Sequence, residues 1–162
     1  MKNFFLVCFL CSIFFSQQAD AQSWDRAIGI RLGFPNSITY KQFVTENAAV
    51  EGILGTRGFL GYRSINIAAA YQIHNDLLQD SFGGLRWYYG AGAGLNMHTY
   101  NNDFAGVKGG VSIGVQGYLG VDYTFSEAPI NISLDWIPTY FITGFSKGFL
   151  GGSGSIAIRY IF

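Results

Sequence analysis

Two histidines, His74 and His98, are the side chains in this sequence best suited to proton transfer near neutral pH. A hydrolase built on His98 would need a hydroxyl group within hydrogen-bond reach of the imidazole and an acid that orients the ring. Thr99, Asp103 and Ser112 lie close to it along the chain. Both histidines fall at the ends of predicted strands, and we expect His98 to be a water-exposed loop side chain without a catalytic role.

Other patterns that bind ligands in proteins have less support. The alternating glycines and alanines of residues 90–94 are not followed by a helical pattern, so they predict a curved strand and not a phosphate-binding loop. Asn101, Asn102 and Asp103 offer too few carboxylates for a dedicated Ca²⁺ site. We therefore predict no catalytic residue, no metal site and no cofactor.

The composition points away from a water-exposed surface. The 162 residues are 17% aromatic and only 12% charged, whereas soluble domains average about 25% charged residues. The formal net charge is +0, which gives no electrostatic reason to expect a nucleic-acid partner. The length is that of one domain.

The first 21 residues have the features of a secretory signal peptide. Lys2 supplies the positive start, residues 4–15 form an apolar run too short to span a bilayer as a helix, and residues 19–21 (Ala-Asp-Ala) form a cleavage site. The mature domain is expected to be 22–162. Both cysteines, Cys8 and Cys11, would be removed with the signal peptide; acylation of one of them, as in a lipoprotein, is the alternative.

The last eight residues, 155–162, alternate between apolar and other side chains and end on aromatic rings. A period of two predicts a β-strand, and lipid would cover its apolar face. Seven earlier segments alternate in the same way. The eight predicted strands are 25–33, 38–44, 48–56, 63–73, 85–95, 109–125, 130–137 and 155–162. Pro138 is expected to weaken any continuation of the seventh. Residues 96–108 are expected to be a loop, and 139–154 either a loop or a loop that carries the strand further. Strands in a membrane must pair on both edges, so we predict an all-β, eight-stranded antiparallel up-and-down transmembrane β-barrel.

Alternation alone does not say which face points inward, because a lipocalin-like soluble barrel has the same period. The polar face consists mainly of Gly, Ala, Ser, Asn and Gln with about one charge per strand, unlike a soluble surface with roughly 25–35% charged residues. Small side chains fit the narrow interior of an eight-stranded barrel. We therefore place the apolar face in lipid. The interior charges, which must largely pair with one another, are Arg31, Lys41, Glu51, Arg86, Asp122, Asp135 and Arg159. A small polar cavity or proton path is the alternative.

With both termini in the periplasm, the loops 96–108 and 139–154 would face the cell exterior. The same orientation gathers aromatic side chains near the periplasmic ends of the strands, as in a membrane-interface girdle. These are Trp24, Tyr71, Trp87, Tyr89, Tyr123, Phe125, Tyr160 and Phe162.

The signal peptide, the alternating strands, residues 85–92 (Leu-Arg-Trp-Tyr-Tyr-Gly-Ala-Gly), residues 134–136 (Leu-Asp-Trp) and the terminal Tyr-Ile-Phe resemble those of small bacterial outer-membrane β-barrels of the OmpX-like and OmpA-transmembrane-like group. The resemblance implies an outer-membrane location, contact with outer-membrane lipids including lipopolysaccharide, and insertion by the assembly machinery through the C-terminal strand. It does not imply one activity. A structural or surface-interaction role with a closed interior is expected; a lipid A-modifying enzyme, an acyl hydrolase or transferase using His98, and a narrow small-solute pore are the alternatives.

Overall fold

The computed structural model describes residues 25–33, 35–59, 62–77, 84–100, 109–144 and 147–162 as eight β-strands. The predicted signal peptide and Trp24 lie outside the described residues. The strands are β1 (Arg26–Gly33), β2 (Asn36–Phe43), β3 (Ala48–Phe59), β4 (Tyr62–Asp76), β5 (Leu85–Tyr100), β6 (Gly110–Thr124), β7 (Ile130–Phe141) and β8 (Gly148–Ile161). No helix in the described part of the chain is long and apolar enough to cross a membrane.

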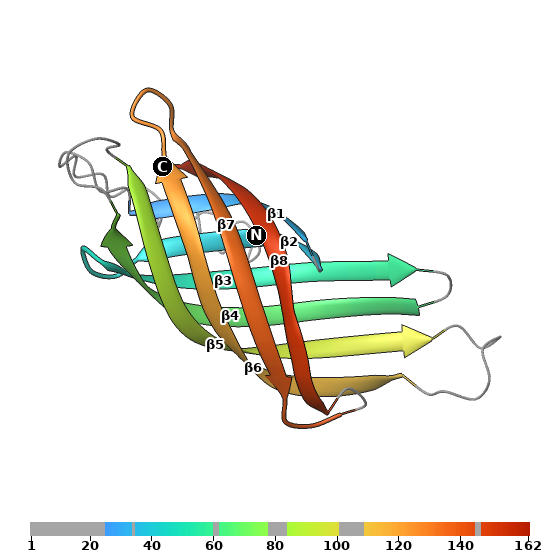
Figure 1. The fold of residues 1–162 in the computed structure, drawn as a ribbon. Coiled ribbons are helices and arrows are strands. Elements are labelled where there is room, and N and C mark those ends of the chain that lie inside the picture. Colours follow the sequence, from blue (N-terminus) through green and yellow to red (C-terminus); the bar gives the residue numbers. More distant parts are fainter. Residues whose placement is uncertain (1–24, 34, 60–61, 78–83, 101–108, 145–146) are drawn as a thin grey trace, which may run out of the picture.

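The eight strands form one closed antiparallel barrel in which each strand pairs with its neighbours in sequence (Figure 1). Closure is made by β1 and β8, where the ladder runs from Ala27 opposite Ile161 to Gly33 opposite Ser155. The start of β1 and the end of β8 therefore lie at the same end of the barrel, together with the β2–β3, β4–β5 and β6–β7 connections. We call this the terminal end, and the opposite end the hairpin end. Because every strand has two partners, no strand edge is left open.

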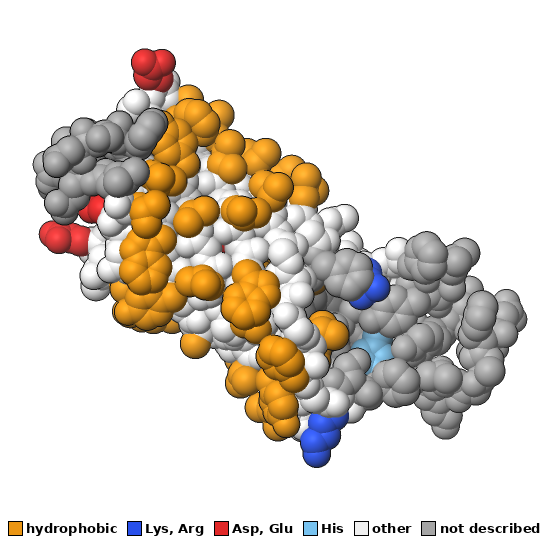
Figure 2. All heavy atoms as spheres, viewed as in Figure 1, with side chains coloured by type: hydrophobic (Ala, Val, Ile, Leu, Met, Phe, Trp, Pro, Cys, Tyr) orange, Lys and Arg blue, Asp and Glu red, His pale blue; other side chains and the backbone are white. Residues whose placement is uncertain are grey.

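The alternation of side-chain types sets which face of each strand points outward. In β8, Ile156, Ile158 and Tyr160 are exposed, whereas the alternate residues Ala157 and Arg159 are buried. The same alternation holds around the barrel, so large apolar side chains cover the outer wall (Figure 2) and polar ones fill the interior. A wall of this kind suits lipid and not water, and it confirms the predicted fold class.

Several strands are longer than the sequence pattern predicted. β5 continues to Tyr100, so residues 96–100 belong to a strand and not to the expected loop. Within 139–154, the alternative of a continuing strand holds at both sides, because β7 runs to Phe141 and β8 begins at Gly148. These extensions lie at the hairpin end, where Thr99 and Gly154 interrupt the outward apolar series while backbone pairing continues through them.

Pro138 lies within β7, and the strand continues past it. The β6–β7 ladder has pairs on either side, Leu119 with Trp136 and Gln116 with Thr139, and the β7–β8 register shifts between Ile137 and Thr139. Proline lacks a backbone N–H and is tolerated in strands mainly at edges and bulges. The shift provides such an irregularity, which is why the strand continues past the proline.

Candidate functional site

The most concentrated group of polar contacts lies inside the barrel and is centred on Glu51 of β3. Arg31 Nη2 lies 3.0 Å from both carboxylate oxygens, and Arg159 Nη2 lies 2.6 Å from Oε1. Gln72 Nε2 donates to Oε2 at 2.7 Å, and Lys41 Nζ lies 3.9 Å from the same oxygen. The Glu51 carboxylate is fully buried, so these charge-assisted contacts take the place of water.

Arg159, from β8, extends the cluster across the interior. Its Nε donates to Thr39 Oγ1 at 3.0 Å, and its Nη1 donates to Asn131 Oδ1 at 3.2 Å and Ser133 Oγ at 2.9 Å. The guanidinium, which extends from β8, therefore contacts groups on β2, β3 and β7. A planar group with five N–H donors in a fixed geometry is suited to such a bridging position.

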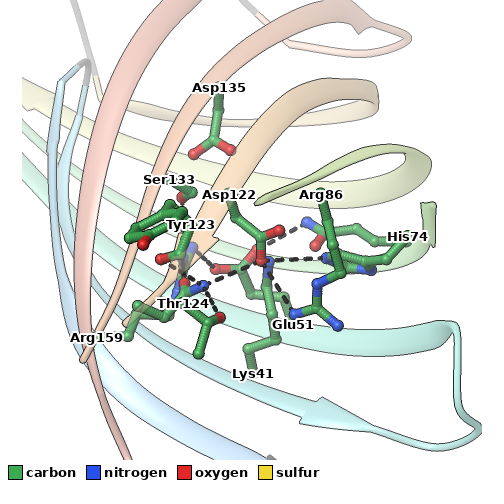
Figure 3. A network of polar contacts seen from close by, with 12 residues as sticks. Lys41, Glu51, His74, Arg86, Asp122, Tyr123, Thr124, Ser133, Asp135 and Arg159 are labelled. Atoms are coloured by element: carbon green, nitrogen blue, oxygen red, sulfur yellow. Dashed lines mark hydrogen bonds and ion pairs between the residues drawn. The ribbon is translucent and has the colours of Figure 1, made fainter. Parts of the chain in front are cut away.

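A second carboxylate, Asp122 of β6, is joined to this cluster through Asn131. The amide of Asn131 accepts from Arg159 and donates to Asp122 Oδ2 at 3.1 Å. Arg86 Nη2 lies 3.5 Å and His74 Nε2 3.9 Å from the same oxygen. In Figure 3 these side chains meet from several strands, with Arg86 and His74 on one side of Asp122 and Arg159 on the other.

The third carboxylate, Asp135 of β7, pairs with Arg31, which also contacts Glu51. Its Oδ2 lies 3.3 Å from Arg31 Nη2 and accepts a hydrogen bond from Ser155 Oγ at 3.2 Å. Arg31 thus connects Glu51 to Asp135 through one terminal nitrogen, Nη2. In Figure 3, Asp135 lies apart from the other labelled carboxylates, Glu51 and Asp122.

Aromatic rings pack against the cations of the cluster. Lys41 Nζ lies 4.4 Å from the centroid of the Tyr88 ring, and the Arg86 guanidinium carbon lies 4.8 Å from that of Phe43. The His74 ring packs between these two rings, with centroid distances of 4.7 Å to Tyr88 and 4.8 Å to Phe43. Cation–π contacts of this kind are strongest where water is excluded.

An apolar layer lies beside the charged cluster, on the side of the hairpin end. Ile53 follows Glu51 by two residues in β3, and Ile137 follows Asp135 by two residues in β7. Both are buried and pack with alanines and a tyrosine in one cluster: Ile53, Ala68, Ala70, Tyr118 and Ile137. The interior thus changes along its axis from a paired charged layer to an apolar one.

The structure places all seven predicted interior charges inside the barrel. Six are at most 3% exposed, whereas the Arg86 side chain, nearer the terminal end, is 16% exposed. The sequence prediction missed polar and aromatic partners that belong to the same cluster, although strand alternation placed several of them on the inward face. The missed residues are Thr39, Gln72, His74, Tyr88, Asn131 and Ser133. Thr39 is two residues from Lys41, and Tyr88 is two residues from Arg86.

The expectation that His98 is an exposed loop side chain is wrong. His98 lies in β5, is 5% exposed and points into the barrel, because it continues the inward series that includes Tyr88. His74 is likewise buried, within β4. The Ser112 hydroxyl, on the strand next to His98, has no hydrogen-bond partner among the described residues, so it is not activated as a nucleophile would be. Asp103 lies outside the described residues.

No group of three or more His, Cys, Asp or Glu side chains that could hold a metal ion occurs in the described ranges. The residues 101–103, considered as metal ligands from the sequence, lie outside those ranges.

Seven of the eight predicted interface aromatics are described, and they lie on the outer wall toward the terminal end. Trp87 stacks on Tyr89 with centroids 5.6 Å apart, and Tyr123 meets the edge of Phe125 at 4.8 Å. Tyr160 is 58% exposed. Tyr40 lies on the same outer wall and was not included in the prediction, although its alternation with Ile38 indicated that position.

The sequence matches no protein-family model and no curated protein sequence, but solved structures are similar. The N-terminal β-barrel domain of Pseudomonas aeruginosa OprF has a TM-score of 0.64 at 16% identity, over 85% of this chain and 95% of that domain. Neisserial surface protein A (NspA) has a TM-score of 0.59 at 19% identity, over 85% and 94%. Ail, the attachment invasion locus protein of Yersinia pestis, has a TM-score of 0.50 at 12% identity, over 85% and 96%. At these identities the likeness concerns the fold, and by its fold the chain is a small eight-stranded transmembrane β-barrel of the outer-membrane type.

Proposed function

We propose that this protein is a non-catalytic barrel of the bacterial outer membrane with a structural or surface-interaction role and a closed interior. The observation that supports this most directly is the buried cluster around Glu51. It joins Arg31, Lys41 and Arg159 from three other strands, and it adjoins the apolar layer of Ile53 and Ile137. An eight-stranded barrel is just wide enough for its side chains to fill, and ions would have to pass both layers.

Exposed charges at the two ends support an orientation with both termini in the periplasm. Among the described residues, the hairpin end exposes the cations Arg57, Arg63 and Lys147 and no carboxylate. The terminal end exposes mainly carboxylates, namely Asp25, Glu46, Asp76 and Glu127. Figure 2 shows the red and blue side chains at opposite ends of the barrel. Cations at the hairpin end suit the phosphates of lipopolysaccharide in the outer leaflet.

The outward aromatics at the terminal end are compatible with this orientation, since Trp and Tyr favour both membrane–water interfaces. With the terminal end inside, Trp87, Tyr123 and Tyr160 form a girdle at the periplasmic interface. The last strand, β8, is then the segment that the assembly machinery of the outer membrane recognises during insertion.

Mass spectrometry of lipid A from cells with and without this protein tests the absence of catalysis. We expect identical lipid A, because the buried hydroxyl of Ser112, which the sequence analysis considered beside His98, has no hydrogen-bond partner in the described part of the chain. An acyl chain gained or lost only in cells that carry the protein would instead support the lipid A-modifying enzyme. A His98→Ala variant that restores the unmodified lipid would then assign the activity.

A further inference from the structure

A small cavity lies inside the barrel at the boundary between the charged cluster and the apolar layer. Its volume is about 30 Å³, and a cavity needs roughly 10–15 Å³ by this kind of measure to hold one water molecule. Arg31, Ser37 and Ser155 contribute polar groups to its wall, Asn66 and Gln116 contribute amides, and Ile53, Ala68 and Ile137 contribute apolar surface. The cavity therefore has room for about two water-sized particles.

Arg31, which lines this cavity, has unused donors. Its Nη2 contacts Glu51 and Asp135, but its Nε and Nη1 have no hydrogen-bond partner among the described residues, although Arg31 is only 2% exposed. Three of the five N–H groups of the guanidinium are thus unpaired. The hydroxyl of Ser37, in the same wall, also has no partner. Buried donors without partners are costly, so these groups require an acceptor that the described protein atoms do not supply.

The charge balance of the interior distinguishes an anion from water as that acceptor. Four cations and three carboxylates point inward, namely Arg31, Lys41, Arg86 and Arg159 against Glu51, Asp122 and Asp135. With both histidines left out of the count, the described interior has one positive charge in excess. Asp135 and Glu51 contact Arg31 through Nη2, and neither lines the cavity.

We propose that this cavity is a binding site for a small monovalent anion of chloride size, held by the Nε and Nη1 groups of Arg31 and by the Ser37 hydroxyl. The anion satisfies the buried donors and neutralises the excess cation at the same time. The site does not depend on the proposed role of the protein, since it would stabilise the barrel whether or not the lumen conducts.

The test is the thermal unfolding of the full chain, refolded in a zwitterionic detergent, at constant ionic strength. Sodium gluconate, whose anion is too large for the cavity, is replaced stepwise by sodium chloride or sodium bromide. A ligand that binds only the folded state raises the unfolding midpoint as its concentration passes the dissociation constant. We expect a saturable rise with either halide, and equal midpoints in gluconate and halide would overturn the proposal.

Two serine variants locate the effect. Ser37→Ala removes one donor from the cavity wall without touching an ion pair, and we expect it to shift the halide response to higher concentration. Ser112→Ala is the matched control, because Ser112 is also a buried hydroxyl without a partner but does not line the cavity; its response should equal that of the wild type. A Ser37→Ala response identical to the wild type would contradict the assignment. In crystals grown in bromide, an anomalous peak beside Arg31 is expected, and ordinary water density there would exclude the site.

Discussion

At the scale of single residues, Glu51 has the largest number of charged neighbours in the cluster. It contacts cations from β1, β2 and β8 and an amide from β4. Because β3 is not hydrogen-bonded to β1 or β8, the contacts with Arg31 and Arg159 cross the interior and restrain strands that the ladder does not join directly. Removing one partner of a buried ion pair typically costs about 3–5 kcal/mol, since the other charge is left unpaired.

We therefore expect Glu51→Gln to lower the free energy of unfolding by about 3–5 kcal/mol. The substitution keeps the size of the side chain but replaces one acceptor oxygen by an NH2 donor and leaves three cations without their shared carboxylate. Urea titration of the barrel in detergent micelles measures the effect. Glu46→Gln is the control, because Glu46 is exposed in the β2–β3 turn and its loss should change stability little. Equal stability of the two variants would show that the cluster does not stabilise the fold.

Asp135→Ala should weaken the barrel less than Glu51→Gln does. Asp135 contacts one cation and one hydroxyl, whereas Glu51 contacts three cations. The measured quantity is the midpoint of unfolding in detergent. An unchanged midpoint for Asp135→Ala would remove the idea that the interior charges act as a stabilising network.

At the scale of elements, alternation within strands predicted the fold and the seven interior charges, because a period of two assigns each side chain to one face. It failed at strand ends. Residues 96–100 include Asn96, His98 and Thr99, whose polarity indicates a loop, yet backbone pairing with β4 and β6 continues through them. For this reason the sequence prediction wrongly placed the His98 side chain in water. The cluster contacts also could not be predicted, since alternation gives the face of a residue but not the register that brings Asn131 between Arg159 and Asp122.

Gly29 in β1 shows how closely the strands approach at the closure of the barrel. A methyl group there would clash with the carbonyl oxygen of Ile158 and lie 2.6 Å from the Cα atom of Arg159. Gly52 in β3 has open space by comparison, with its nearest atom, the Tyr40 carbonyl oxygen, 4.0 Å away. We expect Gly29→Ala to reduce the yield of folded barrel strongly and Gly52→Ala to leave it unchanged. Refolding yield from urea into micelles measures both, and equal yields would contradict the closure described here.

At the scale of the whole molecule, the outer wall distinguishes a membrane barrel from a soluble one. Val115 lies in the central part of β6, opposite Ala93 of β5, and is 47% exposed. In lipid, Val115→Arg should cost about 2–4 kcal/mol, whereas an arginine near the interface costs about 0–1 kcal/mol. Val44→Arg, in the β2–β3 turn, provides the interfacial control. Unfolding in lipid vesicles measures the difference, and equal costs would mean that the wall does not face lipid.

The closed interior is the central claim, and single-channel recording in planar bilayers tests it most directly. The buried Glu51 cluster and the buried layer of Ile53, Tyr118 and Ile137 are the observations that support it. We predict that the inserted wild-type barrel gives no stepwise current in concentrated salt. Insertion is verified separately by resistance to urea and protease. Regular current steps from verified barrels would contradict a closed interior and would favour the narrow pore.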